Sequence, residues 1–203
     1  MPKRKLQRRK NQFFSENYRE SIDYIKESKM FIYSVVFIFF FFALIGFFIP
    51  VPPSLNTIIV NFIENLIATT KDMSASQLIT FIFFNNVQSS LLGMLFGVFF
   101  GVFSVFTTLV NGYLLGFVAK KAVSTEGILI LWKLFPHGIF ELPALFISLG
   151  LGIKLGTTIF QKNSLEKLKN YLIKSVKVFL FVIIPLLFIA AIIEGTLIAL
   201  LGG

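Results

Sequence analysis

The chain has 203 residues, of which 56% are hydrophobic and 27 are phenylalanine, and its mean hydropathy is +0.83. These values lie far outside the range of soluble domains and predict an all-α fold, a polytopic integral membrane helix bundle. The sequence contains no cysteine, which excludes disulfides, thiolate chemistry and cysteine metal sites, and leaves the compartment open.

The net charge of +9 is concentrated in two segments that flank apolar runs. Six of the first ten residues are Lys or Arg, and six of the other thirteen lie between Lys154 and Lys177. This distribution favours a lipid bilayer with an anionic inner leaflet as partner, and no nucleic acid. We predict a basic cytosolic or interfacial arm over residues 1–29 and a transmembrane helical domain over residues 30–203.

Residues 30–49 form the first apolar run and are predicted to be the first span. A cleaved secretory signal is the competing interpretation. It fits poorly, because about thirty residues precede the run and residues 49–53 lack a small-residue cleavage site. By the positive-inside rule, the amino terminus is expected in the cytosol.

Residues 55–70 have the pattern of an amphipathic helix. Their apolar side chains recur at the spacing of one helical face, and Asn61, Glu64 and Asn65 occupy the other face. Such a helix is too polar to span a membrane and is predicted to lie on the outer interface. Packing against the protein's own outer surface is an equally compatible alternative.

Residues 73–119 contain no Asp, Glu, Lys or Arg over 47 positions. One helix of that length would measure about 70 Å, more than twice a hydrocarbon core of about 30 Å, so the segment must turn back and form spans two and three. The return is expected near residues 101–108. Small residues that let helices approach closely are expected at helix-packing positions, namely Gly93, Gly97, Gly101, Gly112 and Gly116.

Residues 131–144 hold the only histidine and the only tryptophan of the sequence. Pro136 disfavours helical geometry at Phe135 and suits the first turn of a new helix, so the sequence predicts a broken helix at Pro136. We expect a short re-entrant or interfacial piece at residues 127–135 and the fourth span at residues 136–156. A fifth span is expected at residues 176–197, bent at Pro185.

The charge pattern also tests the number of spans. With about five transmembrane helices, four of them separate the basic arm from the lysine-rich segment, which places both on one side of the membrane. The sequence therefore predicts a multi-pass protein of the cell membrane, with its amino terminus in the cytoplasm and its carboxyl terminus outside.

Several polar side chains lie within apolar sequence and are candidates for a functional or structural cluster. His137 and Glu141 are four residues apart and share one helix face, so they form a structural hydrogen-bonded pair, a site of proton or ligand coupling, or a catalytic pair. The asparagines are expected chiefly as interhelical hydrogen-bond partners. The candidate cluster comprises Asn85, Asn86, Asn111, His137, Glu141 and Glu194.

The sequence offers little support for an enzyme. A zinc hydrolase would need further nitrogen or sulfur ligands, and the sequence has neither a second histidine nor a cysteine. The nucleophile-elbow, P-loop and nucleotide-binding patterns are also missing from it. We therefore expect no catalytic residue, no metal and no cofactor.

Four short motifs, in order, resemble the stage II sporulation protein M family. They are FNN at residues 84–86, NGYLLG at 111–116, PHGIFELPA at 136–144 and AAIIEG at 190–195. The resemblance covers about residues 75–200 and implies a polytopic membrane protein. The family's namesake works with a membrane-anchored peptidoglycan-degrading enzyme and a further anchoring partner during engulfment of the developing spore. This implies a scaffold without hydrolase activity of its own.

Two hypotheses follow. The first is a membrane scaffold or complex subunit that organises other membrane proteins. The second is a small transporter or transporter subunit with its site at the broken helix around His137 and Glu141. A chain of five spans is small for a transporter, so a homo-oligomer would then be required.

Overall fold

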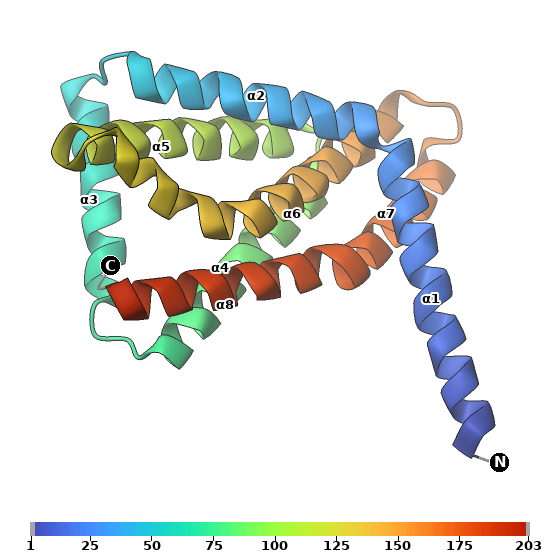
Figure 1. Cartoon of the computed structure of the whole chain (residues 1–203). Coiled ribbons are helices and arrows are strands. Elements are labelled where there is room, and N and C mark those ends of the chain that lie inside the picture. Colours follow the sequence, from blue (N-terminus) through green and yellow to red (C-terminus); the bar gives the residue numbers. More distant parts are fainter. Residues whose placement is uncertain (1–2, 202–203) are drawn as a thin grey trace.

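The computed structural model describes the backbone of residues 3–201 and the side chains of residues 12–130 and 138–200. Every regular element in this part of the chain is a helix, which confirms the all-α prediction. Five of these helices are long and apolar enough to cross a membrane, as the charge pattern predicts. Figure 1 shows them side by side, with α1 and α3 running across opposite ends of the bundle.

The elements follow one another with short connections. In chain order they are α1 (Lys3–Glu27), α2 (Lys29–Phe48), α3 (Pro53–Thr70), α4 (Ala75–Leu95), η1 (Phe96–Val98), α5 (Val102–Glu126), η2 (Ile128–Ile130), α6 (Leu131–Thr157), η3 (Thr158–Phe160), α7 (Ser164–Val178), η4 (Phe179–Ile183) and α8 (Ile184–Leu201).

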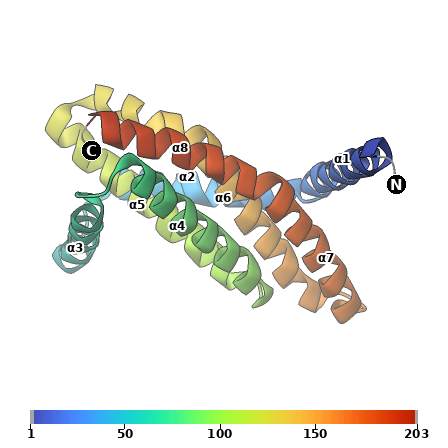
Figure 2. The same cartoon turned by 90° about the horizontal axis from the view of Figure 1, so that it is seen from below.

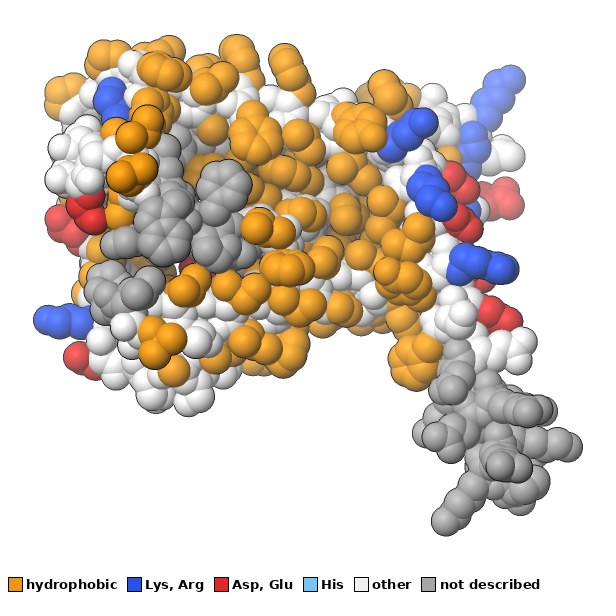
Figure 3. All heavy atoms as spheres, viewed as in Figure 1, with side chains coloured by type: hydrophobic (Ala, Val, Ile, Leu, Met, Phe, Trp, Pro, Cys, Tyr) orange, Lys and Arg blue, Asp and Glu red, His pale blue; other side chains and the backbone are white. Residues whose placement is uncertain are grey.

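Charged and apolar side chains separate along the bundle. Figure 3 shows a broad apolar surface over the middle, with basic and acidic side chains gathered at its two ends. α1 packs against α7 at one end, so the basic arm and the lysine-rich segment lie on the same side. α8 finishes at the other end of the bundle, the end at which α3 lies. Such a distribution suits a bundle whose middle is surrounded by hydrocarbon.

The second and third spans are joined by a turn that is tighter than expected. Phe100 has φ 58° and Gly101 has φ 72°, both in the left-handed region. Two consecutive residues of this kind reverse the chain within residues 99–101, just before the expected range of 101–108. Ser104 Oγ then donates to the Gly93 carbonyl oxygen at 2.7 Å and ties the two helices together.

The fourth span differs from its prediction. α6 is one helix from Leu131 to Thr157, so the expected boundary at Phe135 and the separate piece at residues 127–135 are not observed. Figure 1 shows α6 bending along its length instead. Pro136 and Pro143 each remove one donor from the helical ladder. In a membrane bundle such a loss is accommodated by a kink, because neighbouring helices hold both halves in place.

The last span is longer than predicted. Ser164–Leu200 forms a single membrane-crossing candidate of 37 residues, made of α7, η4 and α8. η4 is a π-helical turn at Phe179–Ile183, directly before Pro185. Because Pro185 has no N–H to donate to the preceding turn, the helix widens at the position where the sequence predicts a bend. The extra residues of α7 extend towards the end that carries α1 (Figure 1).

Glycines mark the closest contacts between spans. Gly97 lies against the backbone of Gly152, and Gly93 lies against the side chain of Leu149, which brings α4 onto α6. Gly112 lies against the Phe39 carbonyl, and Gly116 against the Ala43 carbonyl. A Cβ atom at either of these two glycines would overlap backbone atoms of α2, so α2 and α5 pack as closely as two helices can.

The amphipathic helix forms as α3. It crosses the end of the bundle opposite α1, as Figure 2 also shows from below. Ile59 is buried against the protein, whereas Ile58, Phe62 and Ile67 are exposed. An apolar face exposed at the end of a membrane bundle is expected of an interfacial helix, so the geometry favours that reading over packing on the protein's own surface.

Candidate functional site

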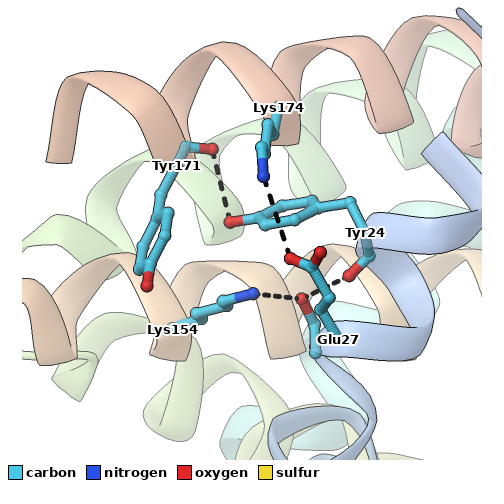
Figure 4. A network of polar contacts seen from close by, with 6 residues as sticks. Tyr24, Glu27, Lys154, Tyr171 and Lys174 are labelled. Carbon is cyan, nitrogen blue, oxygen red and sulfur yellow. Dashed lines mark hydrogen bonds and ion pairs between the residues drawn. The ribbon is translucent and has the colours of Figure 1, made fainter. Parts of the chain in front are cut away.

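The best-defined polar assembly lies where α1 docks onto α6 and α7 (Figure 4). One face of α1 is buried there through the polar side chains of Asn17, Ser21 and Tyr24, and Ser28, which directly follows α1, continues it. Their spacing of four, three and four residues places them on a single helical stripe. Ser21 Oγ donates to the Asn17 carbonyl at 2.7 Å, and Ser28 Oγ donates to the Tyr24 carbonyl at 2.7 Å. Because these hydroxyls are satisfied locally, α1 can approach the bundle closely.

Lys154 is the centre of this assembly. It belongs to α6 and is only 6% exposed. Its Nζ donates to Ser28 Oγ at 2.9 Å and lies 3.9 Å from the centroid of the Tyr24 ring and 4.9 Å from that of the Tyr171 ring. The ammonium group therefore lies within reach of two aromatic faces, one from α1 and one from α7. Cation–π attraction and one charged hydrogen bond join three separate helices at this point.

Lys154, Ser28, Tyr24 and Tyr171 together are called the Lys154 cage, and two ion pairs flank it. Lys177 Nζ lies 2.7 Å from Glu20 Oε2, and Lys174 Nζ lies 3.8 Å from Glu27 Oε2. Both pairs join α7 to α1 and are partly exposed, so each contributes less than a buried contact would. The hydrogen bond from Lys177 lowers the pKa of the Glu20 carboxyl below its ordinary value. The paired Glu20 is therefore ionised at neutral pH.

Tyr24 is the largest side chain that α1 buries. Its phenol oxygen lies 3.5 Å from the Tyr171 carbonyl oxygen, a long and weak hydrogen bond. Burial raises the pKa of the Tyr24 phenol far above its ordinary value, so the ring stays neutral at all physiological pH values. A neutral, electron-rich ring is the form that attracts an ammonium group.

A groove runs along the line where α1 meets α7. It has a volume of about 190 Å³ and is lined by Glu20, Ser21, Asp23, Tyr24, Glu27, Lys174 and Lys177. Its charged side chains are already paired, Glu20 and Glu27 with the two lysines of α7 and Asp23 with Lys26 of α1. The groove is therefore a continuation of the docking contact between the two helices.

The asparagines of the predicted polar cluster make local contacts. Asn85 is exposed on α4, and its amide reaches Asn86 only at 3.5 Å. Asn111 lies on α5, where Nδ2 donates to the Thr107 carbonyl of its own helix at 2.8 Å. The side chain of His137 lies outside the described residues, so its pairing with Glu141 stays a prediction.

The two glutamates lie on helices that pack against each other. Glu141 is half-buried on α6 and Glu194 is half-buried on α8. Gly195 lies against Ile79 of α4, so Glu194 lies at the same level as Ile79. Asn85 is six residues further along α4, about 9 Å away along the axis, which separates it from Glu194. Among the described side chains, Glu194 Oε2 is buried without a hydrogen-bond partner.

Sequence reasoning missed the Lys154 cage. By position in the sequence Lys154 belongs to the lysine-rich segment, although it is the one lysine within the Gly138–Phe160 span. The sequence signal that could have indicated the cage is a lysine near the end of a largely apolar span. Its aromatic partners are 130 and 17 residues away in the sequence, so no local pattern could identify them.

Together these features define an all-helical, multi-pass membrane protein whose amino-terminal helix is docked onto the end of its own last span. The family model for Stage II sporulation protein M matches residues 35–197, and the chain belongs to this family. The match confirms the resemblance seen in the four sequence motifs.

A similar protein shows how much of a relative's length this chain spans. Over 141 residues the chain is 30% identical to an uncharacterized protein of Methanocaldococcus jannaschii. The alignment covers 66% of this chain and 62% of that relative's length. No solved structure matches the chain.

Proposed function

We propose that this protein is a membrane scaffold subunit that organises partner membrane proteins. The observation that carries the proposal is the docking of α1 by the Lys154 cage. A helix held by two aromatic contacts, a charged hydrogen bond and two ion pairs has a fixed position relative to the bundle. It therefore presents a rigid surface at the end of the spans, which is what positioning a partner requires.

The orientation follows from charge. The basic residues of the arm and those of α7 lie at the same end, and the positive-inside rule assigns that end to the cytoplasm. The protein then lies in the cell membrane with its carboxyl terminus on the outer side. The arm also lies where an anionic inner leaflet would attract it.

The outward side of α1 offers a contact surface for another protein. Phe13, Phe14 and Tyr18 are each more than half exposed. The rings of Phe13 and Phe14 lie 6.3 and 6.0 Å from the ring of Phe181, where η4 supports them. The family's name and its namesake's role make a membrane-anchored cell-wall enzyme the first partner class to test. In this proposal the chain works through contacts, without catalytic residues or a cofactor of its own.

A transporter is the second candidate, and one observation favours it. Glu194 holds a buried carboxylate oxygen without a hydrogen-bond partner among the described residues, inside a span. A carboxyl group in such surroundings is a usual element of proton or cation coupling. Glu141 on the neighbouring α6 would be its companion.

Recovery of partners after gentle solubilisation tests the scaffold. Lys154→Met keeps the length of the side chain and removes the ammonium group from the cage, whereas Lys162→Met removes an exposed lysine nearby. We expect Lys154→Met to lose partner proteins that the wild type and Lys162→Met recover. Equal recovery by all three would contradict the proposal. Proton flux into vesicles holding the pure protein, abolished by Glu194→Gln, would support the transporter instead.

A further inference from the structure

A continuous stripe of exposed side chains runs along α4 on the face turned away from the bundle. Its members are spaced four, three, four, four and three residues apart, which places them on one side of the helix. Most are more than one-third exposed, and Phe84 reaches 62%. The α4 stripe consists of Gln77, Phe81, Phe84, Gln88, Leu92 and Leu95.

The opposite face of α4 makes the contacts with the rest of the chain. Gly93 and Gly97 lie against α6, and the Ser90 carbonyl accepts a hydrogen bond from Ser148 Oγ at 2.6 Å. Phe83 packs edge-on against Phe188 of α8, with 5.7 Å between ring centroids. The α4 stripe is therefore left over after the bundle has packed, and it faces the surrounding membrane.

Gln88 makes this stripe unusual. It is exposed and lies close to the middle of the Ala75–Val98 span. Within the part of the chain that the structure describes, its amide group has no hydrogen-bond partner. Lipid tails supply neither donors nor acceptors, so an amide facing them loses every hydrogen bond that water would give.

Three other polar side chains on the spans avoid this loss by bonding within their own helix. The hydroxyls of Ser34 and Thr107 and the amide of Asn111 bond to a carbonyl four residues earlier in their own helix. The glutamine amide of Gln88 makes no such bond. Its partner must therefore come from another chain at the same depth in the membrane.

We propose that the α4 stripe is the surface on which a second copy of this chain docks, α4 against α4. Two copies inserted in the same direction are related by a two-fold axis along the membrane normal, so residues near the axis face their own counterparts. Gln88 carries both a donor and an acceptor and is complementary to itself. The stripe contains no charged residue from Gln77 to Leu95, so pairing it with itself brings no like charges together.

The shape of the same face fits this docking. A hollow of about 390 Å³ opens at the start of α4, lined by Met73, Ser76, Gln77, Thr80 and Phe81. It gives room for the side chains of a facing helix. This inference deepens the scaffold proposal by adding a pairing of the chain with itself.

The natural sequence has no cysteine, so single cysteines report on contacts directly. Leu92→Cys places a thiol on the stripe one turn from Gln88, and Phe37→Cys places one on the exposed face of α2 as a control. The purified protein is reconstituted alone in vesicles and oxidised. We expect a disulfide-linked dimer for Leu92→Cys and none for Phe37→Cys. Adding Gln88→Leu to Leu92→Cys should weaken the dimer by about tenfold in dissociation constant.

Three outcomes would overturn the pairing. They are equal crosslinking of the two single-cysteine variants, crosslinking that is unchanged by Gln88→Leu, and a crosslink in native membranes to a chain of a different mass. Circular dichroism and thermal melting of each variant show whether it is folded. Because the vesicles hold no other protein, failure here leaves the recovery of scaffold partners as a separate question.

Discussion

Substitutions at Tyr24 would measure how firmly the cage holds α1. Tyr24→Phe keeps the ring beside the Lys154 ammonium and removes only the phenol oxygen. Tyr24→Leu keeps much of the apolar volume and removes the aromatic face. The difference between the two variants therefore isolates the attraction between the ring and the cation.

The structure sets the expected sizes. The hydrogen bond from the Tyr24 phenol is 3.5 Å long, so Tyr24→Phe should change the free energy of α1 docking by less than about 0.5 kcal/mol. The Lys154 Nζ lies 3.9 Å from the ring centroid, and Lys154 is largely desolvated. A desolvated cation–π contact is worth about 2 kcal/mol, so Tyr24→Leu should weaken docking by about 2 kcal/mol, close to thirtyfold in the opening equilibrium.

Hydrogen exchange is the suitable assay, because it reports on local opening of α1 separately from unfolding of the bundle. The amides of residues 17–28 should exchange about thirtyfold faster in Tyr24→Leu than in the wild type, and at least about tenfold faster than in Tyr24→Phe, with the spans unchanged. If the two variants exchange at the same rate, the cage does not hold α1. If Tyr24→Phe alone accounts for the loss, the phenol hydrogen bond is the main contact.

Three further outcomes are expected. Gly116→Ala should lower the melting temperature in detergent by overpacking worth about 1–3 kcal/mol or more, because the new Cβ meets the α2 backbone. A Cβ at Gly138 comes no closer than 3.7 Å to any described side chain, so Gly138→Ala should be neutral. The pKa of Glu20 is lowered by Lys177, so the ion pair contributes fully to docking above the ordinary pKa of about 4.5, and this contribution is lost as the pH falls through the lower, docked pKa. Hydrogen exchange at the end of α1 should therefore rise at such low pH in the wild type and not in Glu20→Gln. In intact cells, an impermeant thiol reagent should label Asn65→Cys and spare Asn163→Cys, and the reverse would contradict the orientation.

The spans were predictable because their signal is local and strong. An apolar run of about 20 residues needs a hydrocarbon environment wherever it occurs, so the first span was placed within a residue or two of Lys29–Phe48. The amphipathic helix was predictable for a similar reason, since its period appears in the sequence. The turn was placed a few residues late, because the left-handed backbone of Phe100 has no sequence signature.

The continuity of α6 was not predictable from the proline rule alone. That rule describes an isolated helix, in which no neighbouring element supports the turn broken by the proline. In contrast, α6 is enclosed by α4, α5 and α8. Packing against several neighbours holds the two halves of a kinked helix together. The contacts of the asparagines were not predictable either, because the sequence shows that these residues are polar but does not show which way each side chain points. Asn111 bonds to its own helix, and Asn85 faces outward.

Depth in the membrane explains why Lys154 finds polar partners within the described part of its own chain and Gln88 does not. Lys154 lies near the end of its span, where α1 and α7 can bring aromatic rings and a serine to its ammonium group. Gln88 lies near the middle of its span, beyond the reach of helices that lie across the ends of the bundle. Only another membrane-crossing helix can supply hydrogen bonds at that depth. The chain thus satisfies Lys154 near the membrane surface by folding its own arm back, and in the proposed pairing a second chain satisfies Gln88 at mid-depth. In the scaffold proposal the two features act together, because the same bundle fixes a helix at its end and would bind a second copy at its side.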